Sequence, residues 1–121
     1  MNVRGRLCII LLMLLVALAH SGLYAAGGNA EKGKLLYVNL CIRCHGVEGK
    51  GDGSMTFTPP VTDLSSPASQ SKLDATLMKA IHDGRKDTAM GAWKFVLSEE
   101  EIRDVTAYVR ILGSGASRKA P

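Results

Sequence analysis

The segment that most constrains this chain is Cys41-Ile42-Arg43-Cys44-His45. Two cysteines three residues apart place their thiols about one helical turn apart, on the same side of a helix. A histidine follows at once, so two thiols and an imidazole are concentrated in five residues. The fold must bring these three side chains to one site.

The C-x-x-C-H pattern predicts covalent attachment of a c-type haem. Cys41 and Cys44 can add to two vinyl groups along one porphyrin edge, and His45 then lies beneath the ring as the proximal iron ligand. Three other interpretations stay open: a Cys41–Cys44 disulfide, a thioredoxin-like redox pair and a zinc site. The redox pair would need a βαβ context, which is not visible. A zinc site would need two further ligands, with only His82 as a downstream candidate.

The N-terminal segment 1–25 has the pattern of a secretory signal. Arg4 and Arg6 precede thirteen apolar residues, Leu7 to Ala19, and small residues follow. An uncleaved membrane anchor is the alternative, although thirteen residues rise only about 20 Å against a hydrocarbon core of roughly 30 Å. We therefore expect an exported, periplasmic or secreted protein, which agrees with haem attachment outside the cytoplasm. Cys8 lies within the apolar run and is interpreted as a small hydrophobic residue.

Removing this segment leaves 96 residues with 13 basic and 11 acidic side chains. Such a nearly neutral chain, with its basic residues scattered, does not favour nucleic-acid binding. The whole sequence holds only six aromatic residues, so its hydrophobic core is thin for its size. Small domains of this kind need a disulfide, a metal or a cofactor to supply stability.

The remaining sequence predicts an all-α domain over 26–113 with a flexible tail over 114–121. Three helices are expected, from the Asn29 N-cap to about Cys41, from Ser71 with an Asp74 capping box to Gly84, and from Ser98 to Gly113. Glycine and proline make the stretch between Gly46 and Ser66 irregular, and the stretch from Arg85 to Leu97 is expected to be a loop.

Over residues 29–112 the chain resembles class I c-type cytochromes. The resemblance rests on Gly33 and Tyr37, the C-x-x-C-H segment with Gly46, Gly49 to Gly53, Pro59-Pro60, Met90 to Trp93, Leu97 to Ile102 and Ala107 to Val109. It implies a cytochrome c-like fold, with three main helices and long loops wrapped around one covalent haem. It also implies that the first and last helices cross where Gly33 meets Tyr108.

The resemblance further implies a methionine as the second iron ligand. Met90 is the expected ligand, in a loop before the last helix, although Gly91 stands where the family commonly has proline. Met78 is expected to fill the pocket, and Met55 to be a pocket or surface residue. His82 is the alternative that would give a bis-histidine iron.

Two further roles follow from the resemblance. The carbonyl of Pro59 or Pro60 is expected to accept a hydrogen bond from the second ring nitrogen of His45, and the sequence does not choose between them. Trp93 is expected to cover the haem edge, with its N–H near a propionate. Apart from the resemblance, two interpretations of Lys50, Lys79, Arg85, Lys86 and Lys94 stay open: cations around the exposed haem edge that steer an acidic partner, or solvated surface charges.

The resulting functional expectation is a monomeric one-electron carrier, not an enzyme, because an iron with two protein ligands has no open position for substrate. Its partners would be a membrane donor complex and an oxidase or reductase acceptor, with only peripheral membrane contact unless the signal is uncleaved. One alternative is a haem c subunit of a larger oxidase or periplasmic dehydrogenase. Another is a haem sensor or enzyme in which Met90 is displaced.

Overall fold

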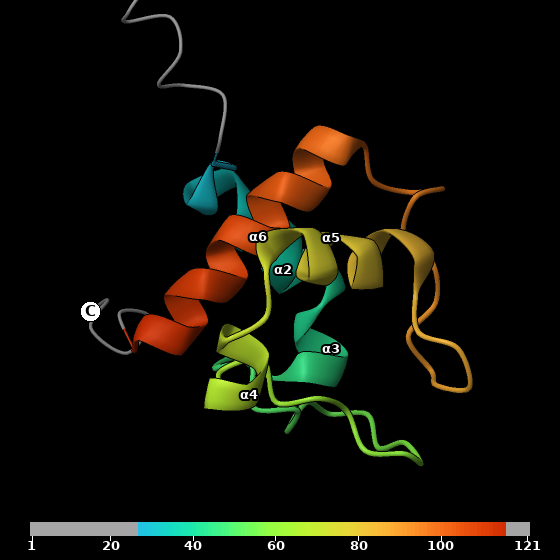
Figure 1. Ribbon diagram of the computed structural model, residues 1–121. Helices are drawn as coiled ribbons and strands as arrows, with labels where there is room; N and C mark the ends of the chain where they lie inside the picture. The colour runs from blue at the N-terminus through green and yellow to red at the C-terminus, as the bar shows by residue number, and fades with distance from the viewer. Residues whose placement is uncertain (1–26, 116–121) are drawn as a thin grey trace, which may run out of the picture.

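The computed structural model describes residues 27–115, and within this range the chain consists of helices and loops without strands. The segments 1–26 and 116–121, which include the expected signal and most of the expected tail, lie outside the described residues. No described helix is long and apolar enough to cross a membrane. The helices, shown in Figure 1, are α2 (Ala30–Leu40), α3 (Ile42–His45), α4 (Pro67–Gln70), α5 (Asp74–Asp83) and α6 (Glu99–Ser114).

Helix α2 begins at the predicted cap. The side chain of Asn29 accepts hydrogen bonds from the backbone N–H groups of Glu31 and Lys32, which have no partners of their own within the first turn. The helix ends at Leu40, and Cys41 is at once its C-cap and the N-cap of α3. The two cysteines and the histidine therefore lie at a junction between two helices.

The last helix also begins as predicted but ends later. Ser98 and Glu101 form the expected capping box, each side chain bonding the backbone of the other residue. The prediction that Gly113 ends the helix is wrong, because α6 continues to Ser114 and Gly115 takes the left-handed conformation that ends it. Gly113 instead allows a close approach, since a Cβ there would lie 2.1 Å from the Gln70 side chain.

The predicted helix from Ser71 to Gly84 is wrong at its start. The chain forms the short helix α4 first, capped by the Ser66 hydroxyl, and α5 begins only at Asp74. The expected capping box does not form, because Asp74 accepts a 2.8 Å hydrogen bond from Nε of Arg110 on α6. A long-range ion pair has replaced a local cap.

Helices α2 and α6 cross at a point where their backbones nearly touch (Figure 1). Gly33 is buried there, and a Cβ at this position would lie 1.9 Å from the carbonyl oxygen of Asp104. The expected meeting of Gly33 with Tyr108 is therefore wrong by one helical turn. Tyr108 packs instead against Tyr37, with 5.2 Å between the ring centroids.

The hydrophobic core lies along one face of α6. Ile102, Val105, Val109 and Leu112 are buried on this face, facing α2 on one side and Leu77 of α5 on the other. The segments 46–66 and 84–98 form no helix, as predicted. These two loops and the three long helices enclose the site.

Candidate functional site

A cavity of about 710 Å³ lies against the core, within the range that buried small molecules and cofactors occupy in proteins. Its walls come from helices α2 to α6 and from both long loops. Most of the lining is apolar, and the aliphatic side chains include Leu40, Leu77, Ile81, Val105 and Val109. A flat apolar group of substantial size would complete the thin core at this position.

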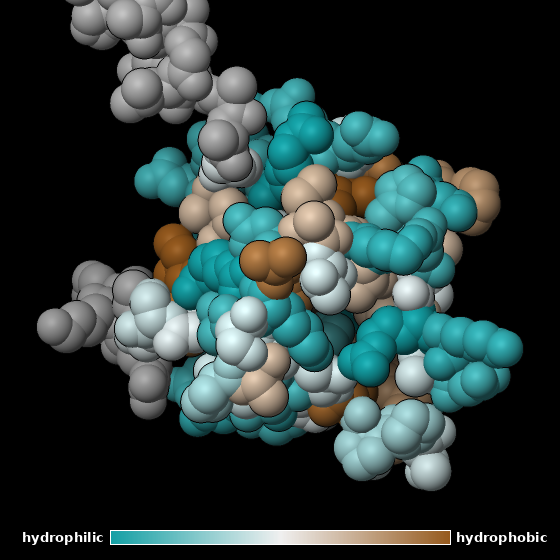
Figure 2. All heavy atoms as spheres, viewed as in Figure 1, coloured by the Kyte–Doolittle hydropathy of each residue, from teal (hydrophilic) through white to brown (hydrophobic). Residues whose placement is uncertain are grey.

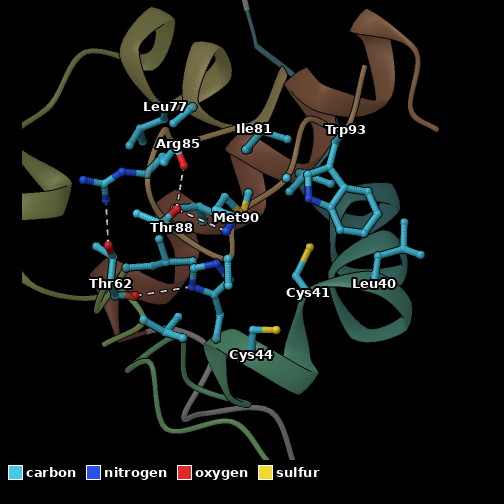
Figure 3. Close-up of a pocket in the computed structure, with 18 of the residues that line it drawn as sticks. Leu40, Cys41, Cys44, Thr62, Leu77, Ile81, Arg85, Thr88, Met90 and Trp93 are labelled. Atoms are coloured by element: carbon cyan, nitrogen blue, oxygen red, sulfur yellow. Dashed lines mark hydrogen bonds between the residues drawn. The ribbon is translucent and has the colours of Figure 1, made fainter. Parts of the chain in front are cut away.

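Cys41, Cys44 and His45 all line this cavity. The helical turn places them, because the N–H groups of Cys44 and His45 both donate to the Cys41 carbonyl, at 3.1 and 2.9 Å. Figure 3 shows the sulfur atoms of Cys41 and Cys44 in the space below Met90 and Trp93. Both cysteines are free thiols, so the disulfide alternative is absent from this structure. Burial and the neighbouring Cys44 raise the pKa of Cys41 to about 11.

His45 presents a neutral imidazole to the cavity. Its Nδ1 lies 3.3 Å from the carbonyl oxygen of Thr62, which can only accept a hydrogen bond. The Nδ1 atom therefore carries the proton in this contact, and Nε2 keeps a free lone pair. Burial lowers the pKa of His45, which also favours the neutral ring. The expectation that Pro59 or Pro60 supplies this carbonyl is wrong, although both prolines line the cavity.

Met90 lines the cavity from a tight turn in the 84–98 loop. The N–H of Arg85 donates to the Met90 carbonyl at 2.9 Å, and the Met90 N–H donates to the Thr88 hydroxyl at 3.1 Å. Gly84 closes the turn with a φ of 74°, and a Cβ there would lie 2.6 Å from the Met90 carbonyl oxygen. The backbone around Met90 is therefore held in one conformation from both sides.

The other candidate iron ligands do not line the cavity. Met78 packs against the core beside Leu77, and Met55 is 41% exposed, with its sulfur 4.0 Å from that of Cys44. His82 forms an ion pair with Asp83, joining Nδ1 to Oδ1 over 2.7 Å. Among residues 27–115, Met90 is thus the methionine that reaches the cavity.

Trp93 lies beside Leu40 and Cys41 at the cavity wall (Figure 3). Its backbone N–H donates to the carbonyl of Ile81, and the next N–H, of Lys94, donates to that of His82. These bonds fasten the returning arm of the loop to the end of α5. That Trp93 covers the haem edge stays a prediction.

The cations expected to surround the site are largely engaged with carboxylates. Lys79 and Lys94 both pair with Asp83, and Lys50 pairs with Glu48. The hydrogen bonds from Lys79, His82 and Lys94 hold the pKa of the Asp83 carboxyl far below its usual range. Figure 2 shows hydrophilic residues spread over this face of the molecule, with hydrophobic residues between them.

Three residues contribute to the site in ways that the sequence did not indicate. Thr62 supplies the His45 acceptor, and Arg85 reaches across the cavity wall to donate a 2.8 Å hydrogen bond to the Thr62 hydroxyl. Tyr37 is buried, lines the cavity and donates a 2.7 Å hydrogen bond to the carbonyl of Gly46. The sequence indicated only Tyr37, through its helical spacing ahead of the cysteines. The contacts of Thr62 and Arg85 join segments that are distant in the chain, so no local pattern predicts them.

The residues present fit a covalently attached haem. Two thiols, one neutral imidazole and one thioether face the same apolar cavity, and imidazole and thioether are both donors that haem iron accepts. Among residues 27–115, no aspartate or glutamate lines the cavity to oppose an apolar macrocycle. Cys41 and Cys44 would hold such a group by covalent bonds, and His45 and Met90 would supply donors to its iron.

Comparison with known proteins gives an independent result. The family model described as cytochrome c matches residues 30–113. The cbb3-type cytochrome c oxidase subunit FixP of Bradyrhizobium diazoefficiens is 35% identical over 89 residues, which is 74% of this chain and 29% of that subunit. The chain thus spans less than a third of this relative.

Two further proteins are matched over nearly their whole length. Cytochrome c-554(547) of Halothiobacillus neapolitanus is 30% identical over 92 residues, covering 70% of this chain and 98% of that protein. The structure of the c-type cytochrome KustC0563 superposes with a TM-score of 0.58 and 25% identity, over 66% of this chain and 95% of that one. A chain of a reducing HAO-like protein complex from Kuenenia stuttgartiensis shares the fold, with a TM-score of 0.61 and 22% identity over 77% of this chain and 46% of its own length.

Proposed function

The chain belongs to the cytochrome c family and carries a covalently bound haem c with its iron, and we propose that this haem lies in the cavity beneath Met90 and Trp93. Cys41 and Cys44 would form its two thioether bonds, and His45 and Met90 would ligate its iron. The observation that carries the proposal is that these four side chains line one cavity. Pro60 and Trp93 contribute to the wall around the haem.

The protein's own residues hold and insulate the site. Thr62 orients the His45 ring so that Nε2 faces inward, and the bonded turn of residues 84–90 presents the Met90 sulfur. The apolar walls exclude water and lower the local polarity, which favours the less charged state of the bound group. When bound, the haem supplies a one-electron couple between ferric and ferrous iron.

The family membership makes the chain a haem electron carrier or a subunit of an electron-transfer complex. Of these, we favour an exported single-haem carrier that passes electrons from a membrane donor to an oxidase or reductase. The nearly complete match to cytochrome c-554(547) supports this choice. With both axial positions of the iron occupied by the chain, the site provides no place for a substrate, so we propose no catalytic activity.

The alternative is a haem subunit of a larger oxidase. The match to FixP, which is named as a subunit of a cbb3-type oxidase, favours it. Size-exclusion chromatography of mild detergent extracts from the native host separates the two proposals. A free carrier elutes at the mass of one chain, whereas a subunit elutes with a large haem-containing complex.

The ligand assignment is tested on the full chain, exported in a host that has the haem c maturation machinery. We expect haem staining on a denaturing gel, lost in the Cys41→Ser/Cys44→Ser variant. Met90→Ala should abolish the near-infrared methionine-to-iron band and lower the reduction potential, while Met55→Ala should change neither. A wild-type ferrous protein that binds carbon monoxide tightly would instead indicate an open iron position and favour the sensor or enzyme alternative.

A further inference from the structure

The two proposed iron ligands are each held by a different loop, and the two loops are far apart in the sequence. His45 depends on the 46–66 loop, because the carbonyl of Thr62 accepts from its Nδ1. Met90 depends on the 84–98 loop, where the turn around Thr88 holds its backbone.

Arg85 has bonds to both loops. Its guanidinium donates to the Thr62 hydroxyl over 2.8 Å, bridging 23 residues of sequence. Its backbone N–H donates to the Met90 carbonyl at 2.9 Å. Its own carbonyl accepts from the Thr88 hydroxyl at 2.7 Å, and that hydroxyl accepts in turn from the Met90 N–H.

These bonds form one continuous path from the proximal to the distal side. It runs from the His45 ring through Thr62 and Arg85 to Met90, and Figure 3 shows the labelled part along one wall of the cavity. All four residues line that cavity. Each step joins adjacent bonded groups, so a displacement of the Thr62 segment would be transmitted to the turn that presents Met90.

We propose that Arg85 is a positioning residue that ties the two ligand-presenting loops together and thereby holds the Met90 sulfur on the iron. The proposal rests on the proposed ligand set of His45 and Met90. Arg85 does not touch the iron in this role. It acts through the Thr62 hydroxyl on one side and the backbone of the turn on the other.

The matched pair Thr62→Val and Thr62→Ser tests the tie, by which we mean the hydrogen bond that joins Arg85 to the Thr62 hydroxyl. Valine removes the hydroxyl that Arg85 contacts but keeps the carbonyl that His45 contacts, and serine keeps both. Imidazole is titrated into the ferric holoprotein, and displacement of Met90 is followed by loss of the near-infrared band. We expect Thr62→Val and Arg85→Met each to tighten apparent imidazole binding roughly fivefold, the change expected for one hydrogen bond, with Thr62→Ser close to wild type.

The double variant Thr62→Val/Arg85→Met should show no larger effect than either single variant, because both remove the same bond. Lys86→Met, which removes a neighbouring charge from the same loop, should leave imidazole binding unchanged. An effect of Arg85→Met without one of Thr62→Val would overturn the tie and indicate that Arg85 acts on the haem itself, for example on a propionate. Additive effects, or no effect of either variant, would overturn it as well.

Failure of the ligand assignment has a different signature. If the near-infrared band is absent from the wild-type protein, or is still present in Met90→Ala, then Met90 is not the iron ligand. The proposed ligand set then fails before any variant of Thr62 or Arg85 is compared. If the band is present and lost in Met90→Ala, the imidazole titrations judge the tie alone.

Discussion

At the scale of single residues, the site depends on a few hydrogen bonds whose partners are far apart in the chain or lie across a turn. The Tyr37 hydroxyl reaches the carbonyl of Gly46, directly after the histidine of the C-x-x-C-H segment. Burial of Tyr37 raises the pKa of its phenol, so the group stays protonated and remains a donor throughout the physiological range. The hydrogen bond from Tyr37 to Gly46 connects helix α2 to the point where the chain leaves the cavity.

Tyr37→Phe tests this bond. The substitution keeps the ring packed on Tyr108 but leaves the buried Gly46 carbonyl without its donor, so we expect a loss of about 1 to 2 kcal/mol in the free energy of unfolding. Denaturant titration of the holoprotein measures it. Tyr108→Phe retains the Tyr37 bond and is the matched control, and an equal loss in both variants would assign the effect to the rings rather than to the hydrogen bond.

At the scale of elements, the crossing of α2 and α6 decides how closely the helices can approach. The backbone of Gly33 lies against the Asp104 carbonyl, and any side chain there must separate the two helices. Separating the two helices would disturb the face of α6 that also forms the core beside the cavity.

Gly33→Ala should therefore destabilise the holoprotein by about 3 kcal/mol, the upper part of the range for overpacking. Thermal unfolding followed by far-ultraviolet circular dichroism measures the change. Gly27→Ala is the control, because nothing lies within 4 Å of a Cβ at that position, and restricting the unfolded chain should make it neutral or slightly stabilising. Equal melting temperatures for wild type and Gly33→Ala would refute the close crossing.

The start of α6 supplies a pH-dependent prediction. The backbone and hydroxyl of Ser98 hold the pKa of Glu101 below its usual value. A carboxyl with a depressed folded-state pKa stabilises the protein above its unfolded pKa of about 4.3, and this contribution is lost as the pH falls through the folded value.

Glu101→Gln should accordingly be less stable than wild type at neutral pH, with the difference shrinking as the pH falls below about 4.3. Urea unfolding at a series of pH values measures it. Glu99→Gln, in the same first turn, keeps the capping box and serves as the control. A difference between wild type and Glu101→Gln that stays constant down to pH 3 would contradict the role of the ionised cap.

At the scale of the whole molecule, the cavity occupies the place where a larger protein would have core side chains. The buried hydrophobic residues lie mainly on α6 with a few from α2, α5 and the loop before α6. Both long loops have the cavity as their inner face. The packing of these two loops therefore depends on what fills the cavity.

We expect the Cys41→Ser/Cys44→Ser variant, purified without haem, to lack a cooperative thermal transition and to bind hydrophobic dyes. The physical reason is that a small domain with an empty apolar centre does not bury enough surface to offset the entropy of its loops. Calorimetry and circular dichroism on the haem-free and haem-loaded chains provide the comparison. A haem-free protein that melts as sharply as the holoprotein would show that the helices alone form a sufficient core.

The sequence by itself determined the features that depend on neighbouring residues. The Asn29 and Ser98 caps, the helical stripe of α6 and the two irregular loops follow from local hydrogen bonding and spacing, and the C-x-x-C-H segment identifies the haem by its own chemistry. Only the tertiary structure decided which carbonyl meets His45, where Gly33 crosses α6 and that Asp74 pairs with Arg110 instead of capping its helix. These contacts join segments that no local pattern relates, and their partners are selected by packing around a shared cavity.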